Sequence, residues 1–205
     1  MSVGKSNAAL PAASLLPERW SEEDPYVSGR PVCRKKILGE RALLREIARR
    51  RRAGQRIVFT NGCFDLLHPG HVRYLRAARR LGDVLVVAIN SDASVRRLKG
   101  PSRPLVPQQD RAEVLAALEV VDLVTIFDDD TPERLIRKIL PDVLVKGGDW
   151  PVSAIVGADV VRAQGGRVRS LPYARGYSTS ALVQRILTRQ KKSAAPTTQL
   201  RNRPT

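Results

Sequence analysis

Short apolar runs alternate with amphipathic segments from residue 56 to residue 190, and this alternation constrains the fold more than any other feature. Most of the runs lack polar alternation, which is typical of parallel strands covered on both faces. The pattern predicts an α/β fold, a single Rossmann-like doubly wound sheet of about five parallel strands with helices on both faces. Ligands bind beyond the carboxyl ends of strands in such sheets. Strands are predicted at 56–60, 83–89, 123–127, 142–146 and 167–171, and helices at about 69–81, 92–98, 107–119, 131–139, 153–164 and 178–189.

The flanks of this region differ from it in composition. Residues 1–37 are rich in Pro, Ser, Gly and Ala and predict a flexible N-terminal extension. Residues 38–190 form the predicted domain, which opens with a helix that ends near Gly54. Residues 191–205 predict a basic flexible tail. No apolar run approaches the ~18 residues of a membrane span, no secretory signal is visible, and two cysteines are too few for a disulfide framework, so a cytoplasmic protein without membrane contact is expected.

The net charge of +16 is concentrated outside the predicted strands and helices of the sheet. Most of the basic excess falls in residues 30–56 and 191–205. Aromatic residues are only 4% of the chain, which disfavours a surface for single-stranded nucleic acid. The charge therefore favours a solvated basic helix face and tail, with nucleic-acid binding through these flanks as the alternative.

Both histidines of the chain lie in "TNGCFDLLHPGH", residues 60–71, just past the first predicted strand. Pro69 suits the first helical position, which makes His68 the N-cap and places His71 near the third helical residue. Both rings then border free N–H groups at a helix start, a favourable place for an anion, and Gly70 would let a phosphate approach the backbone. The alternatives are ordinary surface or capping histidines, or a metal site that includes Cys63. Because no further ligand completes a tetrahedral set, no protein-held metal is predicted.

Four blocks in unbroken order identify a resemblance that covers roughly residues 38–190. They are "TNGCFDLLHPGHVRYLRAARRLGDVLVVAINSD", "RPLVPQQDRAEVLAAL", "DVLVKGGDW" and "YSTSALVQRI". Together they resemble the HxGH nucleotidylyltransferases of the cytidylyltransferase-like superfamily. Within it, they are most similar to the D-glycero-D-manno-heptose 1-phosphate adenylyltransferases, as the free-standing form or as the second domain of the bifunctional heptose kinase/adenylyltransferase.

The resemblance implies transfer of AMP from ATP to a sugar 1-phosphate, giving an ADP-sugar and pyrophosphate by direct in-line attack. The expected acceptor is D-glycero-D-manno-heptose 1-phosphate, Mg²⁺ is expected to arrive with ATP, and the expected assembly is a homodimer. The enzyme alternative is a cytidylyltransferase that acts on glycerol 3-phosphate or a related polyol phosphate.

The resemblance also implies roles for individual residues. Catalytic donors to the phosphates would be His68, His71 and Lys99. Nucleotide-binding residues would be Thr60, Asn61, Gly62, Phe64, Gly70, Lys146, Gly147, Asp149, Trp150, Ser178 and Thr179, and acceptor-binding residues would be Asp92, Arg103 and Arg111.

Three of these side chains have competing structural interpretations. Phe64 could pack in the core, Asp92 could cap a helix, and Arg111 could pair with Asp110 or Glu113.

The sequence departs from the family pattern in three places. No sugar-kinase domain precedes the transferase region, so a single activity is expected and the kinase would be another chain. Arg175 stands where relatives often carry an acidic residue, which leaves the acceptor and base preference open. The basic N-terminal helix and both tails are additional to the family pattern, and no mechanistic role is assigned to them.

Overall fold

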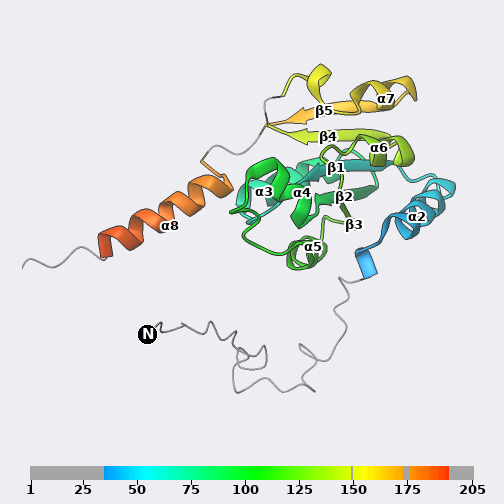
Figure 1. Ribbon diagram of the computed structural model, residues 1–205. Helices are drawn as coiled ribbons and strands as arrows, with labels where there is room; N and C mark the ends of the chain where they lie inside the picture. The colour runs from blue at the N-terminus through cyan, green and yellow to red at the C-terminus, as the bar shows by residue number, and fades with distance from the viewer. Residues whose placement is uncertain (1–34, 149, 173–175, 194–205) are drawn as a thin grey trace, which may run out of the picture.

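The computed structural model describes residues 35–148, 150–172 and 176–193. Its centre is one sheet in the order β3-β2-β1-β4-β5, and every strand pair is parallel (Figure 1). The strands are β1 (Ile57–Gly62), β2 (Val84–Asn90), β3 (Leu123–Phe127), β4 (Val143–Gly147) and β5 (Arg167–Leu171). The predicted fold class is confirmed, and each strand begins within one residue of its predicted start.

Helices connect the strands and cover the sheet. They are α2 (Glu40–Arg52), α3 (Pro69–Arg79), α4 (Asp92–Lys99), α5 (Gln108–Ala116), α6 (Glu133–Ile139), α7 (Ala158–Ala163) and α8 (Thr179–Ser193), with a short 3₁₀ turn, η3 (Val152–Ala154). None of the helices within the described residues is long and apolar enough to cross a bilayer.

Two hydrophobic cores lie on opposite faces of the sheet because successive side chains of a strand point to opposite sides. In β1, Phe59 belongs to the core that includes Leu43 of α2, whereas Val58 belongs to the core that includes Leu75 of α3. All four are fully buried. Burial on both faces explains why the strands read as continuous apolar runs.

One predicted helix, at 153–164, is broken in the structure into η3 and α7. The break falls at Gly157, whose φ of 82° is the left-handed conformation that favours glycine. A Cβ on Gly157 would lie 2.8 Å from Cδ1 of Ile136, so the glycine also permits the close approach of α6. That contact between separate helices is invisible in the local sequence pattern.

The described chain continues past both expected domain limits, from residue 35 to residue 193. Leu38 donates its N–H to the Val124 oxygen at 2.9 Å, and Ile37 forms a bridge with Val124 along the outer edge of β3. Lys36 donates from Nζ to the Leu118 and Val121 carbonyls. At the other end, α8 continues to residue 193 and projects away from the sheet (Figure 1). The remaining parts of both predicted flanks lie outside the described residues.

The strand order reverses beside β1. The chain passes from β1 outward through β2 to β3, and then crosses back to place β4 on the other side of β1. Carboxyl ends of neighbouring parallel strands that diverge in this way leave a crevice between their loops. Gly62 ends β1 and Gly147 ends β4, so both predicted site segments reach this crevice.

Candidate functional site

A cavity of about 580 Å³ lies at the carboxyl edge of the sheet. Segments far apart in sequence meet there, from the end of β1 to the start of α8. Ten of the predicted site residues line it: Asn61, Gly62, Phe64, His71, Lys99, Arg103, Lys146, Gly147, Trp150 and Thr179.

The two histidines are organised by the start of α3. His68 is the N-cap, Pro69 occupies the first helical position, and Nδ1 of His68 accepts the backbone N–H of His71 at 3.3 Å. Their rings stack with centroids 3.8 Å apart and planes 15° from parallel. The predicted capping arrangement is confirmed. His71 lines the cavity, whereas His68, 7% exposed, supports it from behind.

Burial sets the protonation of this pair. Loss of solvent, with a smaller contribution from the neighbouring His68 ring, lowers the pKa of His71 to about 4. Burial also lowers the pKa of His68. Both rings are therefore neutral at pH 7, and His68 carries its proton on Nε2 because its Nδ1 accepts a hydrogen bond. Neutral imidazoles suit the role of hydrogen-bond donors more than that of proton acceptors for a chemical step.

Phe64 packs in the core and also borders the cavity. It belongs to the core on the α3 side and is 6% exposed, and it also lines the cavity. Its φ of 47° is left-handed, which is rare for a bulky side chain and is found at sites where the backbone is constrained. The ring lies 5.1 Å from that of His71, and a Cβ on Gly62 would approach it to 3.1 Å.

The space beside Gly70 is filled by protein. A Cβ on this residue would lie 2.9 Å from Cβ of Tyr177 and 3.0 Å from Nδ1 of His68. The expectation that Gly70 leaves room for a phosphate is therefore corrected: the glycine permits the loop before α8 to pack against the histidine turn. Arg73 adds to this contact, because its Cζ lies 5.5 Å from the centroid of the Tyr177 ring.

Among the described residues, three cations face the cavity: Lys99, Arg103 and Lys146. Arg103 is held by Asp65, which also accepts the N–H groups of Leu105 and Val106. Burial lowers the pKa of Lys146, and the nearby charge of Lys99 lowers it further. Two lysines close enough to influence each other, next to a fixed guanidinium, make a site for a multiply charged anion.

Asp92 and Arg111 do not line the cavity. The Arg111 guanidinium is 1% exposed and donates to Asp92 at 2.7 Å and to the carbonyls of Cys63, Asn90 and Val106 at 2.5 to 3.0 Å. It pairs with neither residue expected from its own helix. The cap of α4 is Ser91 rather than Asp92. The structure thus gives this pair the task of tying the ends of β1 and β2 to α5.

Other predicted residues take supporting positions. Thr60 is fully buried, and its Oγ1 lies 2.5 Å from the Tyr74 hydroxyl, which bonds in turn to the Val145 carbonyl. Ser178 caps α8 by accepting the N–H of Ala181 at 3.0 Å. Trp150, also predicted, is 54% exposed and lines the cavity. Asp149 and Arg175 lie outside the described residues.

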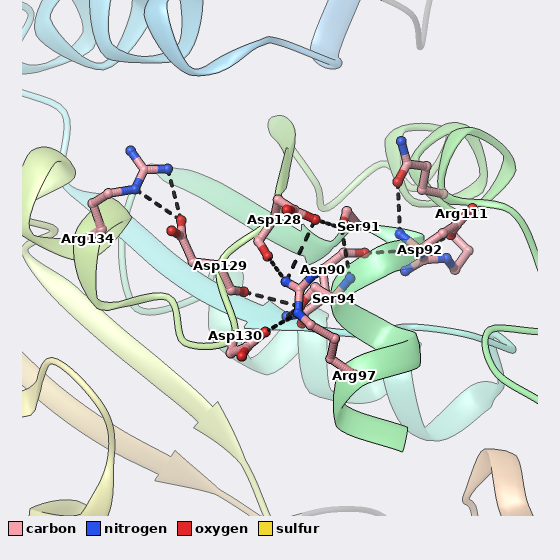
Figure 2. A network of polar contacts seen from close by, with 11 residues as sticks. Asn90, Ser91, Asp92, Ser94, Arg97, Arg111, Asp128, Asp129, Asp130 and Arg134 are labelled. Atoms are coloured by element: carbon pink, nitrogen blue, oxygen red, sulfur yellow. Dashed lines mark hydrogen bonds and ion pairs between the residues drawn. The ribbon is translucent and has the colours of Figure 1, made fainter. Parts of the chain in front are cut away.

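The sequence analysis did not identify the loop at residues 128–132 as part of the site, although this loop follows a strand end at the predicted ligand edge. Figure 2 shows its carboxylates in a network with α4 and α6, in which Arg97 binds Asp130 at 2.7 Å and Arg134 binds Asp129 at 2.9 Å. Ser91 also donates to Asp128. Residues missed by the sequence analysis that line the cavity include Cys63, Asp65, Tyr74, Asn90, Asp130, Thr131 and Pro132.

Comparison with known proteins gives matches over the same region. Residues 59–201 match the family described as Cytidylyltransferase-like. The "Bifunctional protein HldE" of Syntrophotalea carbinolica is 57% identical over 142 residues, 69% of this chain and 29% of that protein. The protein of the same name from Alkalilimnicola ehrlichii is 52% identical over 184 residues, 90% of this chain and 37% of that protein. The chain thus spans about a third of the length of these relatives.

A solved structure of a lipopolysaccharide core biosynthesis protein from Thermoplasma volcanium is 25% identical, with a TM-score of 0.48 over 60% of this chain and 99% of that one.

Proposed function

Because the chain belongs to the cytidylyltransferase-like family, we propose that it is a nucleotidylyltransferase that transfers AMP from ATP to a sugar 1-phosphate. The proposed acceptor is D-glycero-D-manno-heptose 1-phosphate. The arrangement that carries the proposal is the cavity at the β1–β4 crevice, where His71, Lys99 and Lys146 face one space. The similarity to proteins named HldE supports the heptose acceptor through the resemblance noted in the sequence.

The proposed reaction is a single displacement at phosphorus. A phosphate oxygen of the acceptor forms a bond to the α-phosphorus of ATP while the bond to the β-phosphate oxygen breaks, and pyrophosphate leaves. The attacking oxygen is already anionic at neutral pH, so no general base is needed. The protein has to position the two phosphates and offset negative charge as it builds up.

The described residues match these demands. His68 and His71 are neutral donors fixed at a helix start, and Arg103 is held by Asp65. The first turn of α8 brings Thr179 to the cavity with backbone N–H groups at a positive helix end. These groups would orient the triphosphate and stabilise the crowded phosphorus without changing protonation.

Mg²⁺ is proposed to enter with ATP. The described carboxylates that line the cavity are Asp65 and Asp130, and each is already paired with an arginine. Because these carboxylates are already engaged, the site fits an ion that is held mainly by triphosphate oxygens and water. Mg²⁺ often binds in this way in phosphoryl-transfer sites. The ion would neutralise phosphate charge, while the chain's own residues orient the groups.

Pyrophosphate release by the purified protein tests the proposal. ATP and CTP are each paired with heptose 1-phosphate and with glycerol 3-phosphate, in the presence of Mg²⁺. We expect turnover with ATP and the sugar phosphate. Turnover with CTP alone would establish the cytidylyltransferase alternative, and no turnover with any pair, by a protein that binds DNA, would favour a nucleic-acid role. Arg76→Ala, an exposed change on α3, is the matched control for His71→Ala.

The resemblance also leads us to propose a homodimer that works in the cytoplasm. Light scattering after size-exclusion chromatography measures the mass directly, and a mass of one chain, 22.7 kDa, at assay concentration would contradict the dimer.

A further inference from the structure

We propose that the basic groove between α2 and the outer edge of β3 binds the chain's own acidic segment, residues 18–24. The groove is separate from the cavity described above, and the inference does not depend on the proposed activity. The occupant has the sequence "ERWSEED" and lies outside the described residues.

The groove has a volume of about 680 Å³ and combines charge with an apolar floor. Leu38, Ala42 and Leu123 form the apolar part. Its basic lining consists of Lys35, Lys36, Arg45, Arg49, Arg50 and Arg52.

The two acidic residues in the described lining of the groove are already paired with arginines. Glu46 binds Arg49 at 2.6 Å and Arg50 at 2.8 Å, and these hydrogen bonds lower its pKa to about 2. Asp122 binds Arg79 at 2.9 Å and accepts the N–H of Leu85.

Several cations of the groove are left over. Among the described residues, the side chains of Lys35, Arg45 and Arg52 have no acidic partner. Lys36 donates hydrogen bonds to the carbonyls of residues 118 and 121. The groove therefore presents unpaired positive charge beside an apolar surface, and a suitable occupant is acidic with an aromatic or aliphatic side chain.

Residues 18–24 meet both requirements. They carry Glu18, Glu22, Glu23 and Asp24 against the single Arg19, and Trp20 lies among them. The basic excess of the groove and the acidic excess of the segment are complementary, and Trp20 can cover the apolar floor.

The connection between segment and groove is short. Lys35, the first described residue, itself lines the groove, and residues 24 and 35 are separated by a spacer that reaches at most roughly 40 Å when extended. A short tether gives an effective concentration in the millimolar range, so the chain's own segment outcompetes dilute acidic partners. Because the contacts are mostly exposed ion pairs, added salt should release the segment.

Trp20 fluorescence tests docking in the full-length protein. The chain has two tryptophans, so Trp150→Phe leaves Trp20 as the reporter. We expect Trp20 to be protected from acrylamide at low salt. The variant Arg45→Glu with Arg52→Glu, or high salt, should increase quenching and shift the emission to longer wavelength. The matched control, Arg162→Glu with Arg169→Glu, reverses two exposed arginines on α7 and β5 and should change neither.

A second measurement works from the side of the segment. Replacing all four acids, by Glu18→Gln, Glu22→Gln, Glu23→Gln and Asp24→Asn, should uncover the groove, so the variant should elute from heparin at higher salt than a variant with four acids neutralised elsewhere. Equal elution of the two would overturn the proposal. So would equal Trp20 quenching in the groove variant and its control, or protection that grows with protein concentration, which would indicate a second copy as the occupant.

Discussion

His71 donates its backbone N–H to Nδ1 of His68, and the two imidazoles stack with centroids 3.8 Å apart. Each ring therefore depends on the other for its position. His68 fixes the first turn of α3 and buttresses the ring that reaches the cavity. A change at either position is a change to the pair.

The paired histidines predict non-additive losses of activity. His71→Asn should lower kcat by ~100- to 1000-fold, the usual effect of removing a donor to a developing oxyanion. His68→Asn should also lower kcat, because it removes the ring that holds His71 in position. Because the rings support one another, the double variant should lose less than the product of the two single losses. Pyrophosphate-release kinetics on the unchanged protein, the two single variants and the double variant measure how far the losses depart from additivity. Strictly multiplicative losses, with folding intact by circular dichroism, would show that the two rings act independently.

Burial of His71 predicts a pH dependence of stability. The unfolded chain takes up the imidazole proton near pH 6.5, whereas the folded protein, with its pKa at about 4, does not. The contribution of His71 to the free energy of unfolding is fully present above pH 6.5. It is lost as the pH falls toward 4, by at most ~3 kcal/mol.

Urea unfolding from pH 7.5 to 4.5 tests this dependence. His71→Asn should flatten the slope in that window. Some slope should persist from His68, whose pKa is shifted the same way, whereas Glu46 acts at lower pH. An unchanged slope in the variant would refute the assignment to His71.

Gly70→Ala should damage the site, whereas Gly39→Ala should not. The new methyl group at residue 70 would meet Tyr177 and His68 at 2.9 to 3.0 Å, and relief of that overlap must move the histidine turn or the loop before α8. We expect a loss of ~1–3 kcal/mol in unfolding free energy together with a lower kcat. Gly39 has a φ of −66° and open space around it, which makes it the control. Full activity in Gly70→Ala would mean that the close packing is dispensable.

Arg111→Lys should destabilise the fold because a lysine ammonium cannot reproduce the several hydrogen bonds that the planar guanidinium donates. Carbonyls at residues 63, 90 and 106 would lose their buried donors, at a cost of at least ~2 kcal/mol. The urea midpoint should fall, while Arg76→Lys on the surface should leave it unchanged. An unaltered midpoint combined with a raised KM for the acceptor would instead support the direct substrate contact inferred from the sequence.

The strands and the histidine turn could be predicted from sequence because local rules determine them. Runs buried on both faces identify β1 to β4, whereas β5 alternates, with Val168 buried between the exposed Arg167 and Arg169. Pro69 at a first helical position identifies the cap. The long-range partners could not be predicted. The contact of Gly157 with Ile136, the filling of the space at Gly70 by Tyr177, and the pairing of Arg111 with residue 92 each join segments whose closeness appears only after folding.

The candidate site shows the same division. Asn61 and Lys146 were expected from the resemblance, at the ends of β1 and β4, and both line the cavity. The rule that ligands gather at strand ends, applied to β3, would have found residues 128–132. Asp65 is different: it stands inside the histidine motif, but its function as an anchor for Arg103 depends on a loop 38 residues later.

The position of β4 beside β1 also divides the protein into two pieces of chain. One piece carries β1 to β3 with the histidines and Lys99, and the other carries β4 and β5 with Lys146 and the start of α8. Each piece supplies only part of the cavity lining. Cutting the chain between α6 and β4, where no residue lines the cavity, would leave two fragments that each hold part of the site, and their reassembly along the β1–β4 seam would restore every wall of the site at once.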